Sequence, residues 1–555
     1  MTGTYWYRSK SKSRLSSFNL KVSSSIKDHR MSAAAVPGMG WASRGVFQLG
    51  KGKTLAIPMS VHASAREKLC ALMSQRGISA GIILIKGGDE SYQYDTDTEN
   101  IFRQDSWFNY LFGAKEPGLY GTIDIATGKS TLFIPRLSDE YAIWCGEIYP
   151  PSYFVEMYGV DSVLYTDEMT EYLKSKLSTE VQLHVMHGTN SDSGSTIEPP
   201  KFNDYELFSQ HFNTSVLFHA LSTARVTKSP NEIIAMRYCA YVASNAHVKV
   251  MRVASTCATE YELEATFLYE IYKNGGCRKA AYTSICACGP NGAVLHYGHA
   301  GAPNDRQLQA TDMVLLDMGA EYHGYVSDIT CSFPLSGKFT ADQAAIYTGV
   351  LNAQTAVLAA MRPGFSWPDC HKIAEREIIK NLLAIGILVN GTEDELAVAG
   401  MGAIFFPHGL GHLIGCDTHD VGGYIEGTPS RHSQPGLKKL RTARILEEGM
   451  VLTNEPGCYF IDVLLDNALN NPETAKYINN DVLLRFRKFG GVRLEDVVLV
   501  TADGAENLTT CPRTIAEIES VMAGGVWPPA SDSAPQLKRK WVKLSAGGQG
   551  FENLD

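Results

Sequence analysis

The sequence contains no long hydrophobic run. Nowhere do about 18 consecutive residues remain apolar and uncharged, so no segment is expected to span a membrane. Positive charge is also in deficit, because 50 Lys and Arg stand against 59 Asp and Glu and give a net charge of −9. A protein that holds nucleic acid usually carries a strongly basic surface. We therefore expect neither a membrane nor a nucleic acid as a partner.

The cysteines lack a paired spacing. There are twelve in 555 residues, and Cys286 and Cys288 are separated by a single residue, which is not the CxxC spacing of common metal or redox motifs. Scattered cysteines of this kind are typical of reduced thiols in a reducing compartment. The sequence therefore favours a cytoplasmic location.

The first 30 residues have few acids and no apolar stretch. Seven Lys and Arg accompany a single acid, Asp28, and serine is frequent. This composition is typical of an organelle transit peptide and not of a secretory signal. The simpler interpretation is a disordered extension over residues 1–44, or translation from upstream of a start at Met31. At the other end, Pro, Ser, Gly and Lys dominate residues 526–555, which are predicted to be a disordered tail.

The remaining chain is too long for one hydrophobic core, and two domains are predicted. Residues 45–225 mix short apolar runs with turn signals, including a buried strand at 81–85 and a hairpin formed by 120–125 and 130–134. Residues 161–177 show a helical pattern. This combination predicts an α/β domain.

A second domain is predicted over residues 226–525. Ser229-Pro230 is a helix-start signal with an acid, Glu232, in the first turn, and a long helical pattern follows over 233–253. Helices and strands alternate after this point, which indicates one large domain with α+β character.

Two acids sit in the arms of a predicted hairpin. The apolar run from Met313 ends in Asp317, a glycine-containing turn follows, and the return strand carries Asp328. Neighbouring carboxylates repel unless a proton or a cation is shared between them. The pair therefore indicates a cation site, although two unrelated turn acids would give the same pattern.

Three histidines fall within twelve residues, at 408, 412 and 419. The four-residue spacing of His408 and His412 would suit a zinc-binding helix, but the intervening Gly409 and Gly411 make a helix improbable, and no Glu follows His408. In an extended segment, residues four apart also share a face. Glycine lets the backbone approach a ligand or a metal closely. The cluster therefore indicates a binding site.

Three charged residues interrupt apolar strands further along. Glu455 ends one apolar run, and Arg493 and Glu495 lie two residues apart in another. Charged side chains are rarely buried without a partner, so these strands require counter-charges. An ordinary internal ion pair between Arg493 and Glu495 remains the alternative explanation.

Together these residues supply four carboxylates and one imidazole. An oxygen-rich set of this kind suits Mn²⁺ or Co²⁺ better than a thiolate zinc site. Four carboxylates carry too much negative charge for a single ion, so two divalent metals per chain are expected, with Mn²⁺ preferred.

At this point the sequence resembles the pita-bread metallopeptidases, which include methionine aminopeptidase, aminopeptidase P and prolidase. The order Asp317, Asp328, His412, Glu455, Glu495 is that of the family. The prolidase group is the most similar over residues 45–525. The motifs that carry this resemblance are LHYGHAGAPNDR at 295–306, SDITCSFP at 327–334, HGLGH at 408–412, GLKKLRTAR at 436–444 and FRQDS at 102–106.

The resemblance implies a fold and an activity. The fold is an α/β creatinase/prolidase-like domain followed by an α+β pita-bread domain. The activity is hydrolysis of Xaa-Pro dipeptides by a hydroxide that bridges two divalent metals. The resemblance also implies a homodimer.

The resemblance further implies roles for single residues. Asp317, Asp328, His412, Glu455 and Glu495 would be the metal ligands, with Asp328 and Glu495 bridging, and Glu455 would also be the general base. His296 and His419 would stabilise the anionic transition state. The expected substrate contacts are His296, His419, Arg441, Tyr282 and Arg493. Arg441 would grip the C-terminal carboxylate, for which a guanidinium is well shaped, and Arg444 is its local competitor.

Two other functions stay open. An aminopeptidase P would act on longer peptides with proline second, and whether Arg441 closes the pocket against chain extension distinguishes the two. A non-catalytic binding protein on the same fold is the second alternative. It predicts lost ligands, whereas all five are present.

Overall fold

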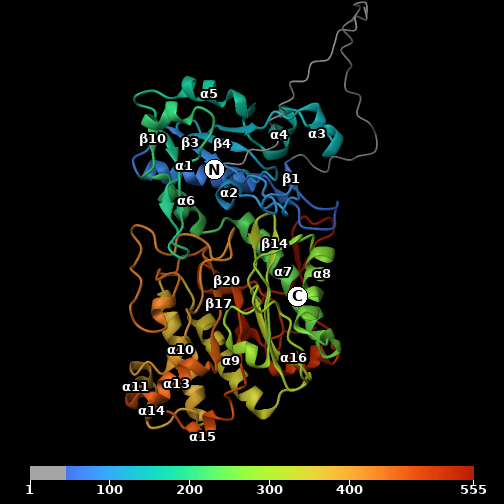
Figure 1. Ribbon diagram of the computed structural model, residues 1–555, viewed down its shortest axis with the longest axis vertical. Helices are drawn as coiled ribbons and strands as arrows, with labels where there is room; N and C mark the ends of the chain where they lie inside the picture. The colour runs from blue at the N-terminus through green and yellow to red at the C-terminus, as the bar shows by residue number, and fades with distance from the viewer. Residues whose placement is uncertain (1–44, 555) are drawn as a thin grey trace, which may run out of the picture. The chain divides into compact units, whose positions relative to one another are not determined.

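The computed structural model describes residues 45–554. The predicted extension at 1–44 lies outside these residues, so its disorder stays a prediction. A six-stranded mixed sheet forms the centre of the N-terminal part, in the order β10-β7-β3-β4-β5-β6 (Figure 1). Strand β3 is antiparallel to β4 and β4 to β5, while the other neighbours are parallel. The strands are β3 Ile82–Lys86, β4 Tyr120–Asp124, β5 Ser130–Ile134, β6 Ser162–Tyr165, β7 Leu183–Val185 and β10 Phe212–Asn213. The predicted strand at 81–85 and the predicted hairpin are therefore confirmed.

Helices cover both faces of this sheet. Successive side chains of a strand point to opposite faces, and in β3 the side chains on both faces are apolar. Ile83 and Ile85 of β3 belong to the same apolar cluster as Leu69 of α1, whereas Ile82 and Leu84 pack with Leu173 of α5. The helices are α1 Ser60–Gln75, α2 Ser106–Phe112, α3 Asp139–Trp144, α4 Pro151–Tyr158, α5 Met169–Lys176 and α6 Leu217–Val226. Short strand pairs complete this part: β1 Val46–Phe47 with β2 Ile57–Pro58, and β8 Gly188–Thr189 with β9 Thr196–Ile197.

The predicted helical pattern at 161–177 is only half correct. Its first residues form β6, which pairs in parallel with β5 at the edge of the sheet, and the helix begins only at Met169. Val163, with its branched side chain, and Tyr165 suit a strand, and hydrogen bonding to β5 decides between the two conformations.

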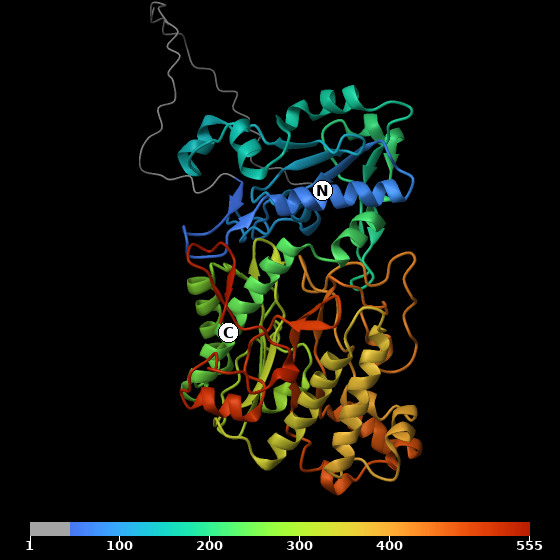
Figure 2. The same cartoon turned by 180° about the vertical axis from the view of Figure 1, so that it is seen from behind.

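In the second part of the chain, strands lie between two pairs of helices (Figures 1 and 2). The pair α7 Pro230–Val253 and α8 Glu260–Gly275 packs on strands β12, β14 and β15, and α9 Ala341–Ala360, paired with α10 Trp367–Ala384, packs on β17, β18 and β19. The predicted long helix is confirmed as α7. The hydroxyl of Ser229 accepts the backbone N–H of Glu232, and the Glu232 carboxylate accepts that of Ser229. This reciprocal capping fixes where the helix begins.

The strands of this part form small antiparallel sheets that meet around one point. The orders are β11-β14-β15, β12-β13-β16, β17-β20-β21 and β18-β19. The bounds are β11 Lys279–Ala280, β12 Ile285–Cys288, β13 Met313–Asp317, β14 Ala320–Tyr322, β15 Tyr325–Val326, β16 Thr330–Pro334, β17 Val451–Asn454, β18 Gly457–Tyr459, β19 Gly491–Arg493, β20 Asp496–Val500 and β21 Ala505–Asn507. Smaller helices follow at α11 Glu393–Val398, α12 Gly402–Phe405, α13 Asp462–Asn470, α14 Pro472–Ala475, α15 Asn480–Leu483 and α16 Ile515–Met522.

The prediction of a disordered tail is wrong for residues 526–554. They form strands β22 Val542–Leu544 and β23 Phe551–Asn553, which pair with each other. Arg539 is buried, bonds Glu517 at 2.7 Å and Asp532 at 2.8 Å, and lies over the rings of Trp527 and Trp541. Two tryptophans and one ion-paired arginine supply the packing that the Pro, Ser and Gly content conceals.

Ion pairs join the two parts of the chain, and residues 45–554 fall within one compact unit. Arg103, just before α2, bonds Glu321 of β14 at 2.6 Å, and Arg225 of α6 bonds Asp420 at 2.7 Å. Helix α6 ends at Val226, one residue after the predicted domain boundary. All twelve cysteines are free thiols, and nine are buried, as predicted. Over the described range, no helix is both long enough and apolar enough to cross a membrane.

Candidate metal centre

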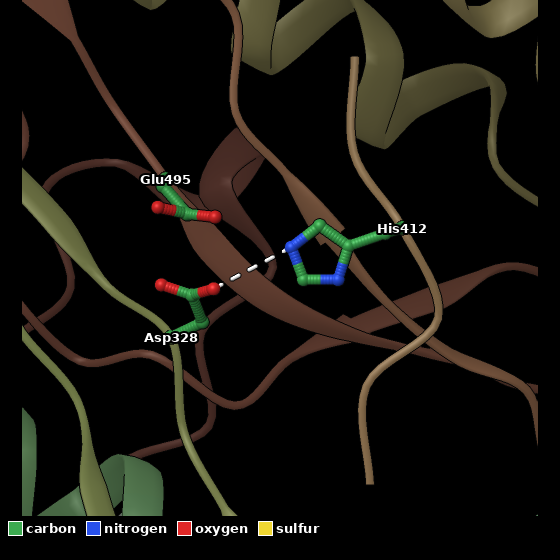
Figure 3. A group of neighbouring side chains, drawn as sticks. All are labelled: Asp328, His412 and Glu495. Carbon is green, nitrogen blue, oxygen red and sulfur yellow. Dashed lines mark ion pairs between the residues drawn. The ribbon is translucent and has the colours of Figure 1, made fainter. Parts of the chain in front are cut away.

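Three of the predicted ligands converge on one point. Asp328, His412 and Glu495 are all buried, and each offers a ligand atom that lies within 4.8 Å of the others (Figure 3). They come from three separate strands or strand ends, so only the folded chain brings them together. Asp317 and Glu455 adjoin this group, as the contacts below describe.

The hairpin that carries Asp317 and Asp328 forms as predicted. Strand β13 pairs with β16 so that Asp317 lies opposite Thr330, and the hairpin continues through β14 and β15. The hydroxyl of Tyr282 lies 2.6 Å from Asp317 Oδ1 and 2.5 Å from Asp328 Oδ1. One hydroxyl therefore holds an oxygen of each carboxylate on the same side of the site.

Gly319 makes the close approach of these two arms possible. A Cβ at this position would lie 1.9 Å from the carbonyl oxygen of Ser327, which no side chain tolerates. The Ala320 N–H also donates to the Ser327 hydroxyl at 3.0 Å. The glycine thus sets the separation of the segments that carry the two acids.

His412 is oriented by its own backbone. The segment from His408 to His412 is not helical, as predicted, but it bends at His408 and Leu410 instead of running fully extended, and Leu413 forms a bridge with Leu452. His412 Nδ1 lies 3.0 Å from the Leu413 carbonyl oxygen, so Nδ1 carries the proton and donates it. The unprotonated Nε2 then faces Asp328 Oδ2 at 3.4 Å and Glu455 Oε1 at 3.7 Å. A ring fixed in this way presents a lone pair to a metal.

Glu455 and Glu495 close the group from the other side. Glu455 follows β17, and its second oxygen lies 3.6 Å from His408, so two histidines flank one carboxylate. Glu495 lies between β19 and β20 and accepts a hydrogen bond from the Thr330 hydroxyl at 2.7 Å. Thr330 stands opposite Asp317 in the hairpin, so this bond ties Glu495 to the pair of aspartates.

Like charges crowd this site. Burial, followed by the charge of Asp317, raises the pKa of Asp328 well above its usual value, and burial and Asp328 do the same for Glu495. Burial and Glu495 raise the pKa of Glu455 to about 8. Burial lowers the pKa of His412 and keeps its imidazole neutral. Carboxylates that repel each other around a neutral imidazole are a strong ligand set for divalent cations.

Arg493 is hydrogen-bonded within the protein. It is buried, and its guanidinium donates to Asp317 Oδ2 at 2.8 Å, to the Tyr459 hydroxyl at 3.0 Å and to the Thr330 hydroxyl at 3.1 Å. All three nitrogens are therefore engaged by protein atoms. This geometry gives Arg493 a role in positioning Asp317, and its contact with substrate stays a prediction. The internal ion pair joins Arg493 to Asp317, not to Glu495.

Two of the predicted substrate residues, His419 and His296, lie close to the ligand group. The rings of His412 and His419 meet edge to face, with centroids 4.5 Å apart. Desolvation, then the charges of Arg493 and Arg441, lowers the pKa of His296, and desolvation and His412 lower that of His419. Both imidazoles are therefore neutral near pH 7.

Arg441 is paired with a residue that the sequence did not indicate. Its Nη1 lies 3.5 Å from Asp192, which belongs to the loop between β8 and β9 of the N-terminal part. The Asn190 side chain fixes that loop by accepting the Asp192 N–H at 2.8 Å. The side chain of Arg441 is 30% exposed, so part of its guanidinium is open to solvent.

A second missed group anchors the loop that carries His419. Asp420 is buried between Arg225 at 2.7 Å and Lys228 at 3.1 Å, and Asp417 contacts Arg225 at 2.8 Å. The sequence shows Asp417 and Asp420 beside His419, and Arg225 and Lys228 near the end of a predicted helix. It does not show that these acids and cations, almost 200 positions apart, form ion pairs.

The donor set fits divalent metal ions. Four carboxylates and one oriented imidazole face each other, three of the carboxyl pKa values are raised by burial and mutual repulsion, and the acids stay together although they repel. Cations bound between them would remove that repulsion. Fold and site together define a metal-dependent hydrolase.

Comparison with known proteins agrees with this class. The family model for metallopeptidase family M24 matches residues 234–502, and the model for the aminopeptidase P N-terminal domain matches residues 62–185. The chain is 49% identical to the Xaa-Pro dipeptidase of Homo sapiens over 480 residues, which are 86% of this chain and 96% of that relative. It is 37% identical to a probable Xaa-Pro aminopeptidase of Botryotinia fuckeliana over 452 residues, 81% of this chain and 94% of that relative.

A solved structure resembles most of the described fold. The aminopeptidase PepP of Pseudomonas aeruginosa superposes with a TM-score of 0.67 at 32% identity and covers 84% of this chain and 98% of its own. The chain therefore belongs to metallopeptidase family M24, and the expected α/β domain followed by a pita-bread domain is confirmed. Divalent metal ions are the cofactors that this family implies.

Proposed function

We propose that this protein is a prolidase, a dipeptidase that hydrolyses Xaa-Pro with two divalent metal ions per chain, Mn²⁺ by preference or Co²⁺. The proposal is supported by the convergence of Asp328, His412 and Glu495, with Asp317 and Glu455 adjoining them, in a chain 49% identical to an Xaa-Pro dipeptidase. Asp317, Asp328, His412, Glu455 and Glu495 would hold the ions. Metals bound there would lower the pKa of a water molecule and polarise the scissile carbonyl.

The chain itself supplies the proton transfers. Glu455 lies at the edge of the ligand group, and its pKa near 8 without metal makes it a carboxylate that readily takes up a proton. His419 and His296 are neutral, so each has an N–H that can donate to the oxygen on which negative charge develops. Tyr282 and Arg493 keep Asp317 in place for this arrangement.

Arg441 is the residue proposed to bind the C-terminal carboxylate of the substrate. Its guanidinium is partly exposed, and the contact with Asp192 occupies only one edge of it. The remaining N–H groups offer the planar fork that binds a carboxylate with two hydrogen bonds. Because Asp192 lies in the N-terminal part, that part contributes to the wall of the pocket.

Aminopeptidase P is the second candidate. The solved relatives are aminopeptidases P, and the fungal relative at 37% identity is named as an Xaa-Pro aminopeptidase. A non-catalytic binding protein is a weaker alternative, since all five ligands are retained. A dipeptidase and an aminopeptidase P differ in whether the substrate can carry a residue after proline.

Substitution of Arg441 distinguishes the dipeptidase hypothesis from the aminopeptidase P hypothesis. In Arg441→Ala, kcat/KM for Gly-Pro should fall by about 10- to 150-fold, the value of a charge-assisted contact of ~1.5–3 kcal/mol. Metal content should not change, and Arg441→Lys should recover only part of the activity. Gly-Pro amide should be poor for the unaltered enzyme and lose little more in the variant.

Arg444 provides the matched control. Its Nε donates to the Gly422 carbonyl oxygen at 2.7 Å, which gives it a structural role in the same segment. Arg444→Ala should therefore affect Gly-Pro and Gly-Pro amide equally. An unaltered enzyme that prefers Xaa-Pro-Xaa tripeptides over Xaa-Pro would contradict the dipeptidase proposal and support aminopeptidase P.

A homodimer and a cytoplasmic location belong to the same proposal. Ile143 and Trp144 on α3 are 76% and 77% exposed, an unusual degree for large apolar side chains, and they offer a contact for a second copy. A light-scattering mass of one chain at working concentration would contradict the dimer. The twelve free thiols support a reducing compartment.

A further inference from the structure

A second cavity lies apart from the candidate metal centre, between the N-terminal part and the pita-bread domain. Its volume is about 320 Å³, and none of the candidate metal ligands lines it. Its walls come from β1, the segment 101–104, β11 and the turn between β14 and β15. A volume of this size suits a small organic molecule better than a bare ion.

The lining of the cavity includes five large apolar or aromatic side chains, two of them exposed. Phe47, Leu49, Ile101, Phe102 and Tyr322 line it. Leu49 is 43% exposed and Ile101 is 53% exposed, although both are large aliphatic side chains. Apolar groups that stay in water around a concave surface mark a site where a ligand would bury them.

The charged side chains of the cavity are mostly basic. Arg103, Lys115, Arg278 and Lys279 line it together with one acid, Glu321. That acid is already engaged, because Arg103 Nε donates to it at 2.6 Å. Within residues 45–554, no carboxylate lies at ion-pair distance from Lys115, Arg278 or Lys279. Four cations and one acid therefore line the cavity, an excess of three positive charges.

The cavity adjoins the parts of the fold that carry the metal centre. Its turn at His323 and Gly324 is the tip of the hairpin whose two arms carry Asp317 and Asp328. Arg103 also donates to the Cys416 carbonyl oxygen at 2.7 Å, in the loop between His412 and His419. The FRQDS segment, which the metal centre does not use, thus supplies the residue that joins the cavity to both loops.

We propose that this cavity binds a small organic anion, namely a carboxylate, sulfonate or phosphate ester that carries an aromatic or branched apolar group. The excess positive charge would neutralise the anionic group, and the apolar wall would cover the remainder. An inorganic anion would leave the apolar wall exposed, and a neutral molecule would leave the cations uncompensated. None of the candidate metal ligands belongs to this site.

A pair of fluorescent probes that differ only in charge tests the proposal. 8-Anilino-1-naphthalenesulfonate carries an aromatic system and one sulfonate, and N-phenyl-1-naphthylamine is the same molecule without the sulfonate. With the metal-loaded full-length protein, the sulfonate should bind saturably at one site per chain. In the double variant Arg278→Glu/Lys279→Glu its Kd should rise by about tenfold or more, since two attractive charges become repulsive. Lys115→Glu should act in the same direction and serves if the double variant does not fold.

The matched control is Lys249→Glu, which changes the same charge in a separate surface groove on α7. It should leave the Kd for the sulfonate within about twofold, because exposed charges at a distance are screened by salt. The neutral probe should bind more weakly than the sulfonate to the unaltered protein and should not distinguish the variants. Equal affinity for the two probes, or equal effects of Lys249→Glu and the double variant, would overturn the proposal.

Discussion

Removal of the Arg493 guanidinium is the most informative perturbation of the metal centre. In Arg493→Met the aliphatic stem stays, while the contacts with Asp317, Tyr459 and Thr330 are lost. Asp317 then remains among three other carboxylates without its cation. The structure therefore predicts a loss of stability that depends on whether metal is bound.

The magnitude follows from the geometry. Breaking a buried ion pair by removing one partner costs about 3–5 kcal/mol, and the attraction of two unit charges about 4 Å apart gives ~4 kcal/mol at an effective dielectric constant of 20. Bound cations would supply the missing positive charge. The remaining loss would be the two hydrogen bonds to Tyr459 and Thr330, or about 1–3 kcal/mol.

Denaturant unfolding of the chelated and the Mn²⁺-loaded protein measures both values. In each state, Arg493→Met should have a lower free energy of unfolding than the unaltered chain. Bound Mn²⁺ should make the difference between these two free energies smaller. Arg539→Met is the matched control, because Arg539 is equally buried and pairs with Glu517 and Asp532 away from the metal centre. It should destabilise the protein to the same extent with and without metal. If chelated Arg493→Met is as stable as the unaltered protein, the buried ion pair does not support the site.

Two further predictions concern the same group. Burial and Glu495 raise the pKa of Glu455 to about 8, so the folded, metal-free protein binds this proton more tightly than the unfolded chain. Stability of the chelated protein should therefore fall as pH rises from about 5 to about 8; Glu455→Gln should flatten the dependence, and an unchanged slope in that variant would assign it to other groups. Gly319→Ala would place a Cβ 1.9 Å from the Ser327 carbonyl oxygen and displace the two aspartates, so metal affinity should fall by about 10- to 100-fold. Gly504→Ala, whose Cβ would meet nothing closer than 3.6 Å, is its control in a metal titration, and equal affinities of the two variants would contradict the role of Gly319.

The sequence was sufficient for features that depend on neighbouring residues. The start of α7 at Ser229 and Pro230 and the hairpin of Asp317 and Asp328 follow from local signals, and the structure has both. That the histidine segment is not helical was also predictable, because Gly409 and Gly411 disfavour a helix. The long-range pairing of strands brings these segments together around the metal centre, and no local sequence pattern specifies that pairing.

Features that depend on distant partners were missed or misread. The sequence indicated Glu495 as the ion-pair partner of Arg493, whereas Arg493 bonds Asp317 and Tyr459, which lie on other strands. Asp192 reaches Arg441 across about 250 positions, and its Asn190-stabilised loop resembles any surface turn in the sequence. Composition alone predicted a disordered C-terminal segment, because a high content of Pro, Ser and Gly does not reveal that Arg539 packs over the rings of Trp527 and Trp541.

Metal content measured together with Gly-Pro hydrolysis tests the central claim most directly. The freshly purified protein should contain two divalent ions per chain and should hydrolyse Gly-Pro, and a chelator should abolish the activity until Mn²⁺ is returned. Asp328→Asn and Glu495→Gln each remove one of the carboxylates that surround His412, so each variant should lose at least one ion and nearly all activity. Two ions per chain with full hydrolysis in either variant would contradict the account.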